Sequence, residues 1–252
     1  MSKVPAAENT LRILEYLAGQ RGPVPAATIA GALGLPRSTV YHLLAVLMDH
    51  GFVLHFPEAK RYGLGVASYE LSSAFSRQEP LSRLGRPILA ALVDGLGESG
   101  HLAVLHGRDV VYIVEERAPG RPRLITDVGV RLPSHLTASG RALLATLPPG
   151  QLRALYPDAS AFEDRTGAGP HSYAELRRVV TDAREAGFAT EDGDVTPGFA
   201  SVAVSVRDHA GWPAAGIAIT FPRENVSREE WPALASRVRE AAAELSRRIR
   251  GS

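Results

Sequence analysis

The chain has 252 residues, of which 45% are hydrophobic and 22% are charged. This is the composition of a globular protein with room for two domains or one large one, so a wholly disordered chain is excluded. Because 28 basic residues nearly balance 27 acidic ones, the overall charge favours neither nucleic acid nor membrane as a partner. Any indication of function must therefore come from motifs.

Several classes are excluded by what the sequence lacks. It contains no cysteine, which rules out disulfides, thiolate metal sites and cysteine nucleophiles and fits a reducing compartment. Its longest apolar stretches, such as residues 102–105 and 110–114, are far shorter than the roughly 20 residues of a membrane span. The charged N-terminal segment lacks the apolar run of a secretory signal. We therefore expect a cytoplasmic protein without membrane contact.

The first 65 residues predict three short helices followed by a β-hairpin. The helices are expected over residues 9–18, 26–33 and 36–51, with Asn9 or Thr10 as the first N-cap, and the strands over 52–56 and 61–64. The third helix carries an apolar stripe at i, i+3, i+4 and i+7, formed by Val40, Leu43, Leu44 and Leu47. That stripe faces a core, so the opposite face is left for solvent or a partner.

A tight glycine turn between two short helices, followed by a hairpin, is the arrangement of a winged helix-turn-helix. Seven side chains are candidate DNA contacts: Arg37, Ser38, Thr39, Tyr41, His42, Lys60 and Arg61. The arginine and histidine on the helix can reach base edges, the hydroxyls can donate to phosphates, and the tyrosine can pack on a sugar or thymine methyl. The two hairpin cations can grip the backbone or minor groove. A small helical domain with ordinary solvated charges is the alternative, and the order of the elements favours DNA binding.

Residues 66–79 predict a linker helix, after which the chain alternates helices and strands. Helices are expected over residues 83–96, 137–147, 173–186 and 228–250, and strands over 101–106, 110–115, 201–207 and 214–220, with a surface loop at 162–172. Hairpins followed by packed helices indicate an α+β domain with an antiparallel sheet.

Three blocks, taken in order, resemble the IclR family of bacterial transcriptional regulators over essentially the full length. The first comprises residues 29–44 with Gly51-Phe52 and 62–65, the second is 131–145, and the third runs from 187 to 206. Winged helices alone are common, so the combination with the two later blocks carries the resemblance.

The resemblance implies three parts: a DNA-binding winged helix at residues 1–65, a linker helix at 66–79 that helps dimerisation, and a GAF-like effector-binding domain at 80–252. It further implies a homodimer or a dimer of dimers. Because one winged helix offers few phosphate contacts, we expect two copies on a palindromic DNA operator, and we expect no metal or cofactor. We expect a repressor that a small organic effector releases from its operator. An effector-dependent activator is the alternative.

The resemblance also suggests where the effector binds. The matching positions are Leu132, Ala138, Ser139, Gly140, Glu191, Ser201, Ala218 and Thr220. Four of them depart from the family pattern: Glu191 stands where Asp is frequent, Ser201 where Cys is frequent, and Ala218 and Thr220 where two serines can occur. No known effector is therefore carried over. A carboxylate or carbonyl compound is expected at the helix start, and an amide-like or hydroxylated one is the alternative because Glu191 disfavours a bare anion.

Three other interpretations compete for the C-terminal part. A metal site at His101 and His106 is disfavoured because a spacing of five sends strand residues to opposite faces. A hydrolase could combine His101, His135 and Ser139 with Asp127 or Glu191, but no Gly-x-Ser-x-Gly motif occurs. A scaffold that senses nothing would fill its pocket with large apolar side chains. We therefore expect a regulator and not an enzyme.

Overall fold

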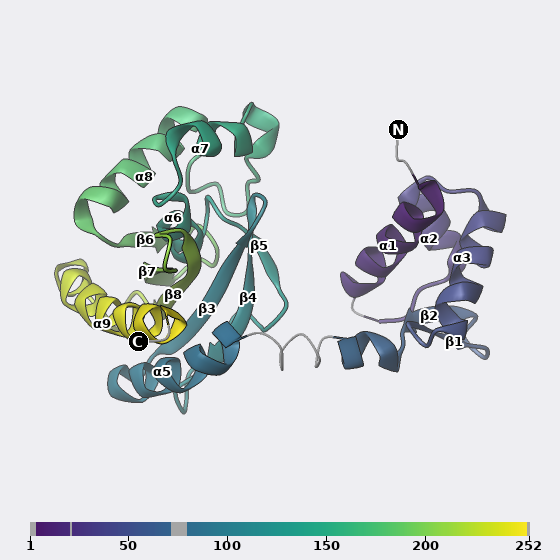
Figure 1. Ribbon diagram of the computed structural model, residues 1–252, viewed down its shortest axis with the longest axis horizontal. Helices are drawn as coiled ribbons and strands as arrows, with labels where there is room; N and C mark the ends of the chain where they lie inside the picture. The colour runs from purple at the N-terminus through teal and green to yellow at the C-terminus, as the bar shows by residue number, and fades with distance from the viewer. Residues whose placement is uncertain (1–3, 21, 72–79, 251–252) are drawn as a thin grey trace. The chain divides into compact units, whose positions relative to one another are not determined.

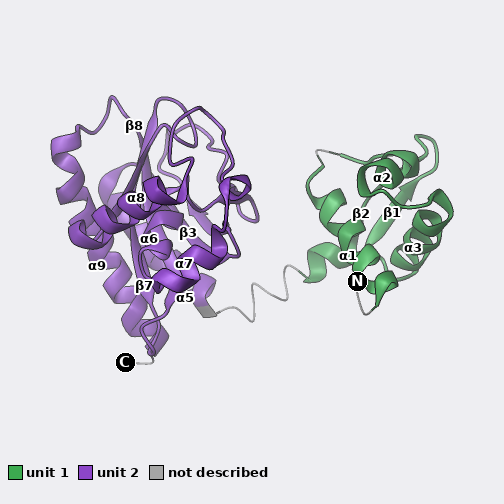
Figure 2. Ribbon diagram, turned by 90° about the horizontal axis from the view of Figure 1, so that it is seen from above, with its two compact units in different colours: residues 1–79 green, residues 80–252 purple. Residues whose placement is uncertain are grey.

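The computed structural model describes residues 4–20, 22–71 and 80–250. The chain divides into two compact units, residues 1–79 and 80–252 (Figure 2). Of the predicted linker helix, residues 66–71 are helical, whereas 72–79 lie outside the described residues.

Among its described residues, the first unit has three helices and a two-stranded antiparallel hairpin, followed by the helical residues 66–71 (Figure 1). Its elements are α1 (Pro5–Ala18), α2 (Ala26–Leu33), α3 (Arg37–Asp49), β1 (Val53–Phe56) and β2 (Arg61–Leu64). The core is a single apolar cluster whose most buried members are Ile13, Ile29, Val40, Leu44 and Val53. The predicted N-cap of the first helix was wrong, because Pro5 suits an initial helical turn and the helix starts there.

The turn between α2 and α3 sets the angle of the third helix. Gly34 has φ of 66°, in the left-handed region that glycine adopts without steric cost. The next residue, Leu35, donates its backbone N–H to Ala30 O at 3.0 Å, which closes the end of α2. Pro36 then precedes the first residue of α3. This sequence of glycine and proline ends one helix and starts the next within three residues.

The second unit packs helices on both faces of a six-stranded sheet. Its helices are α5 (Pro80–Leu96), α6 (Ala138–Leu144), α7 (Pro149–Leu155), α8 (Tyr173–Ala186) and α9 (Trp231–Arg250), with 3₁₀ turns η1 (Ala159–Ala161) and η2 (Arg228–Glu230). The strands are β3 (Ser99–His106), β4 (Asp109–Glu116), β5 (Arg131–Pro133), β6 (Ala189–Asp192), β7 (Phe199–Arg207) and β8 (Pro213–Pro222).

The sheet order is β5-β4-β3-β8-β7-β6, and all neighbours are antiparallel. Helices α5 and α9 cover one face of the sheet and α6 lies on the other (Figure 1). The main core lies between the sheet and the first pair of helices, with Leu89, Leu102, Ile219, Phe221 and Leu245 among its fully buried members. The predicted α+β class with an antiparallel sheet is confirmed.

Four short elements were not predicted, namely β5, β6, α7 and η1. The four residues of β6 read Ala-Thr-Glu-Asp, and two acidic side chains in succession give no strand signal. The predicted helix over 137–147 is shorter, because Thr137 is its N-cap and the helix ends at Leu144. No helix within the described parts of the chain has the length and apolar character needed to span a membrane.

Candidate functional site

The exposed face of α3 carries the residues that the sequence predicted for DNA contact. Arg37, Ser38, Tyr41 and His42 are exposed, and Thr39 is half-buried. The reason is the apolar stripe on the other face, where Val40 and Leu44 are buried in the core. Tyr41 is 53% exposed, a large aromatic surface without cover from its own unit.

The two cations of the hairpin, Lys60 and Arg61, differ in how their side chains are held. Lys60 is exposed at the tip, with φ of 52°. Arg61 donates from Nη1 to Pro23 O at 3.1 Å, so its guanidinium is held against the segment before α2. Both remain on the surface of the unit and outside its core.

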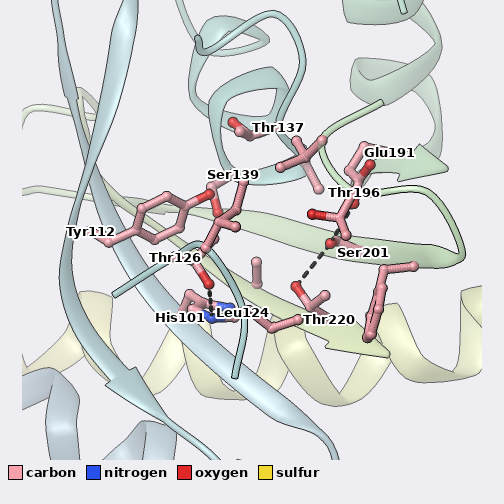
Figure 3. Close-up of a pocket in the computed structure, with 15 residues that line it drawn as sticks. His101, Tyr112, Leu124, Thr126, Thr137, Ser139, Glu191, Thr196, Ser201 and Thr220 are labelled. Carbon is pink, nitrogen blue, oxygen red and sulfur yellow. Dashed lines mark hydrogen bonds between the residues drawn. The ribbon is translucent and has the colours of Figure 1, made fainter. Parts of the chain in front are cut away.

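A cavity in the second unit lies between the sheet and the start of α6 (Figure 3). Its lining comprises His101, Tyr112, Leu124, Ile125, Thr126, Thr137, Ala138, Ser139, Glu191, Val195, Thr196, Phe199, Ser201, Ala218 and Thr220. The free space is about 20 Å³, enough for about one water molecule. A larger ligand would therefore have to displace part of the lining.

Six of the eight predicted effector contacts line this cavity: Ala138, Ser139, Glu191, Ser201, Ala218 and Thr220. The other two predictions, Leu132 and Gly140, do not. Leu132 is 3% exposed and packs into an apolar cluster beside Leu143. Gly140 faces the Ser134 backbone so closely that a Cβ on it would lie 2.1 Å from the carbonyl oxygen. Both residues support the wall from behind.

Much of the opposite wall of the cavity was not predicted from the sequence. His101 was weighed only as a metal ligand or hydrolytic residue, although its strand passes under the cavity. Tyr112 had no distinguishing motif. The segment 124–126 lies in irregular chain that no pattern places over a cavity, and Ile125 there is 41% exposed. These residues meet only because β3, β4 and the loop after β4 fold together.

One wall of the cavity is a chain of polar groups built from three neighbouring strands. Ser201 Oγ donates to Glu191 Oε1 at 2.8 Å, and it lies 2.9 Å from Thr220 Oγ1. The pairing of Glu191 with Ser201 and of Ser201 with Thr220 across β6, β7 and β8 puts them in a row. Burial raises the pKa of Glu191 from 4.5 to about 7, which the hydrogen bond from Ser201 only partly opposes.

The facing wall is neutral. The Thr126 hydroxyl lies 2.6 Å from Nε2 of His101, and burial lowers the pKa of His101 to about 4, so the imidazole is uncharged at pH 7. Burial also raises the pKa of Tyr112, with the Glu191 charge as a further cause, so its hydroxyl keeps its proton. Ser139 is 1% exposed, and its Oγ has no hydrogen-bond partner in the described structure.

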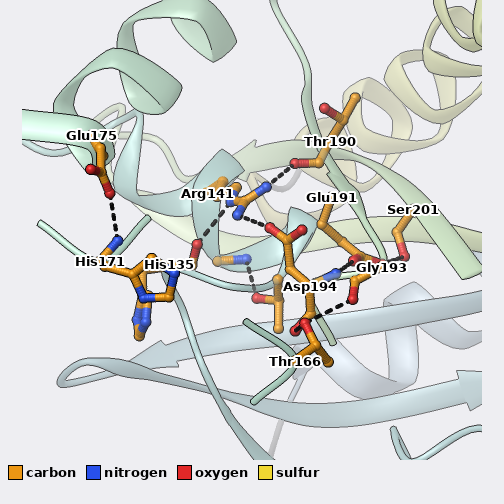
Figure 4. A network of polar contacts seen from close by, with 12 residues as sticks. His135, Arg141, Thr166, His171, Glu175, Thr190, Glu191, Gly193, Asp194 and Ser201 are labelled. Carbon is orange, nitrogen blue, oxygen red and sulfur yellow. Dashed lines mark hydrogen bonds and ion pairs between the residues drawn. The ribbon is translucent and has the colours of Figure 1, made fainter. Parts of the chain in front are cut away.

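Behind the cavity, a buried ion pair holds the loop after β6 (Figure 4). The guanidinium of Arg141 pairs with Asp194 and donates to His135 O at 2.8 Å and Thr190 O at 2.7 Å. The backbone N–H of Asp194 in turn donates to Glu191 Oε2 at 3.2 Å. Arg141 therefore fixes the loop that holds Glu191, and its own charge is already compensated.

The hydrolase combination does not come together. His135 lies outside the cavity lining, with Nε2 3.0 Å from Glu163 O and its ring against Tyr156 and Phe162. Asp127 does not line the cavity either. His101 and His106 are separated as the strand spacing predicted, one buried and one exposed. Within the described residues no group of three or more His, Cys, Asp or Glu side chains is placed to hold a metal.

A winged helix with an exposed polar recognition face, joined to an α+β unit with a polar internal cavity, defines a class: DNA-binding regulators that respond to small molecules. Two family models match the chain. The IclR helix-turn-helix domain matches residues 6–55, and the bacterial transcriptional regulator IclR C-terminal domain matches residues 74–247. The chain therefore belongs to the IclR family of bacterial transcriptional regulators, and not to the enzymes.

Individual relatives agree over nearly the whole length. The chain is 30% identical to the glycerol operon regulatory protein of Streptomyces coelicolor, covering 97% of this chain and 96% of that protein. It resembles the crystal structure of Thermotoga maritima IclR with a TM-score of 0.71 and 25% identity, over 97% and 98% of the two chains. An IclR homologue from Microbacterium hydrocarbonoxydans, solved in complex with 4-hydroxybenzoate, has the same fold with a TM-score of 0.83 and 22% identity, over 98% and 100% of the chains.

Proposed function

We propose that this regulator binds a palindromic operator through residues 1–65 and is released when a small organic effector enters the cavity of residues 80–252. The observation that carries the proposal is that the chain has two polar surfaces, which differ in their exposure to solvent. One is exposed on α3, and the other is buried between α6 and the sheet. An effector-dependent activator with the same two sites is the alternative.

The roles on the DNA side follow from chemistry and position. Arg37 and His42 would read base edges, while Ser38 and Thr39 would hold phosphate oxygens. Lys60, at the hairpin tip, would contact the backbone of the duplex. As a DNA-binding regulator the protein would work in the cytoplasm, where a bacterial chromosome lies.

Two copies are needed in this proposal, because one winged helix makes few phosphate contacts and reads only a short site. The helical residues 66–71 support dimerisation, since Val66, Tyr69 and Leu71 are 62%, 74% and 63% exposed. A homodimer, or a dimer of dimers, would place recognition helices about 34 Å or a multiple of it apart on a palindrome.

The proposed effector site consists of the residues that line the cavity and also match the effector positions of the family. Entry of a molecule larger than water would move the 124–126 segment or the loop after β6. Release of DNA requires that the occupied state favours a different spacing of the winged helices, and a coupling of about 1–3 kcal/mol is the usual scale.

The test is a DNA titration with an operator selected by the wild-type chain from genomic fragments. We expect Arg37→Ala to weaken binding by about 1–3 kcal/mol and to relax sequence preference. Lys60→Ala should weaken binding to all sequences and flatten its salt dependence. Arg237→Ala, on the exposed surface of α9, is the matched control and should change neither.

The effector half of the proposal has its own variant. Ser201→Leu fills the cavity, so it should abolish release by an effector while operator affinity stays near that of the wild type. Unchanged operator binding by both DNA-face variants would refute the first half. Full release of Ser201→Leu by the effector would place the effector site elsewhere.

A further inference from the structure

Building on the proposed function, we infer that the effector is an uncharged molecule with at least one hydroxyl, which it donates to Glu191, and that carboxylate anions are rejected. Four features of the charge and hydrogen-bonding chemistry of the cavity support this ligand class.

First, none of the described residues that line the cavity is a lysine or an arginine. Arg141 belongs to the helix that forms one wall, but it is bound to Asp194 and to two backbone carbonyls. The imidazole of His101 is buried and already bonded to Thr126. A carboxylate would therefore leave water without meeting an opposite charge, which is the costly way to bury an ion.

Second, the acidic side chain in the cavity opposes an anion directly. Glu191 is 4% exposed and accepts from Ser201 and from the Asp194 backbone, so its oxygens are held in place. A ligand carboxylate beside it would put two like charges in a buried site. A ligand hydroxyl, in contrast, would give this acceptor another donor.

Third, the wall that faces Glu191 carries two hydroxyls that have no side-chain hydrogen bond within the described part of the chain and are available to a ligand. The hydroxyl of Tyr112 points toward Ser139 in Figure 3. Neither has a side-chain hydrogen bond among the described residues, and Ser139 Oγ is fully enclosed. Each can donate to a neutral ligand oxygen and accept from a ligand hydroxyl. A molecule with two oxygens, at least one of them a hydroxyl, would satisfy both walls.

Fourth, most of the remaining lining is apolar, with Thr137 and Thr196 as the exceptions. Leu124, Ile125, Val195 and Phe199 surround the space between the two polar walls. They would cover a short carbon skeleton, and they make the site less favourable still for an ion. The combination describes a small polyol, hydroxy-amide or hydroxylated aromatic alcohol.

The test uses matched probes that differ in charge and little else. Each set contains an acid with its primary amide and primary alcohol: lactate, lactamide and propane-1,2-diol; glycerate, glyceramide and glycerol; 4-hydroxybenzoate, 4-hydroxybenzamide and 4-hydroxybenzyl alcohol. Calorimetry on the full chain measures binding, and Ser201→Leu identifies which binding occurs in the cavity. Tryptophan fluorescence of each variant checks its folding. We expect the Ser201-dependent ligands to be uncharged members of these sets.

A second variant tests the contact to Glu191. Glu191→Gln keeps the shape and removes the charge, so an uncharged ligand should bind at least about tenfold more weakly, while the matching acid should bind more tightly. Glu240→Gln, on the surface of α9, is the matched control and should change neither. Tyr112→Phe removes one hydroxyl and should weaken the uncharged ligand alone.

The pH dependence separates the two ligand classes as well. Arg141, Asp194, Tyr112 and His101 are the charged or titratable groups around Glu191, and of these the first two form an ion pair. An uncharged donor favours ionised Glu191, so its affinity should rise with pH through about 7. An acid needs the protonated carboxyl, so its affinity should fall over the same range.

Two results would overturn the inference, and they are distinguishable. Ser201-dependent binding of the acids to the wild-type chain, at least as tight as that of their uncharged counterparts, would refute the uncharged ligand and leave the proposed function intact. Absence of Ser201-dependent binding by every probe would overturn the inference and the effector half of the proposed function together.

Discussion

The two units use polar residues in opposite ways. In the first, the polar side chains proposed for DNA contact lie on the outside of α3, and the core beneath them is wholly apolar. In the second, Glu191, Ser139 and His101 are at most 4% exposed, and they face a cavity inside the unit. A surface site tolerates change because its residues support nothing else. An internal site is part of the fold, so changes there alter the stability of the second unit together with its response to an effector.

The buried ion pair is where this contrast is greatest. Arg141→Ala leaves Asp194 as an unpaired charge that is 7% exposed, and we expect a loss of about 3–5 kcal/mol in the free energy of unfolding of the second unit. Arg86→Ala is the matched control, because it removes a pair with Glu116 that is 55% exposed on the arginine side. That pair is worth at most about 1 kcal/mol.

Tryptophan fluorescence can follow the unfolding of the second unit separately from that of the first. The chain has 2 tryptophans, Trp212 and Trp231, and both belong to the second unit. Denaturant unfolding followed at this signal therefore reports that unit alone. Equal losses in the two arginine variants would show that burial of the ion pair does not matter.

The cavity groups should also make stability depend on pH. The folded-state pKa of Glu191, about 7, lies above its ordinary 4.5, so the folded state binds more protons between these values and loses stability as pH rises through that window. The full effect is about 3 kcal/mol. Glu191→Gln should remove this loss, so its stability relative to the wild type increases from pH 4.5 to 7.

His101 should make the stability of the second unit depend on pH in the opposite direction. Its folded pKa of about 4 lies below the ordinary 6.5, so the unfolded state binds more protons and stability falls as pH drops from 6.5 to 4. His101→Gln would lack that fall. Denaturant unfolding of both variants at several pH values checks the pair, and identical pH profiles in wild type and Glu191→Gln would contradict the assignment.

The space around glycine residues shows how closely the second unit is packed at the cavity wall. A Cβ at Gly140 would lie 2.1 Å from Ser134 O and 2.4 Å from its Cα, and backbone atoms cannot move aside cheaply. We expect Gly140→Ala to cost about 2–3 kcal/mol and to shift the start of α6. Fluorescence-detected unfolding measures the loss, and a variant as stable as the wild type would show that this wall of the cavity is pliable.

The smallest effect is expected in the first unit. Gly31 lies inside α2, and a Cβ added there would meet nothing within 4 Å, so Gly31→Ala should stabilise that unit by about 0.5–1 kcal/mol. Calorimetric unfolding should show the gain, while the tryptophan signal stays unchanged because it reports the other unit. Destabilisation would mean that the helix has a partner at this face.

How far the sequence could predict each region follows from the range of its interactions. Helix α2 and helix α8 were predicted with the bounds that the structure shows, because glycine ends both and apolar spacing marks both buried faces. Strand β6 was missed because its stability comes from pairing with β7. The sequence of its four residues does not predict that pairing. The family resemblance supplied six cavity residues, whereas Tyr112 and Thr126 came only from the structure.

By itself, the sequence determined the exposed face of α3, since a helix of period 3.6 with one apolar stripe must present Arg37, Tyr41 and His42 on the other side. It also determined the α+β class of the second unit through its hairpins and amphipathic helices. Only the tertiary structure decided which polar groups share the cavity and what charge they carry. Glu191 and His101 meet there from strands far apart in the chain, and their pKa shifts arise from burial, which depends on every element that surrounds them.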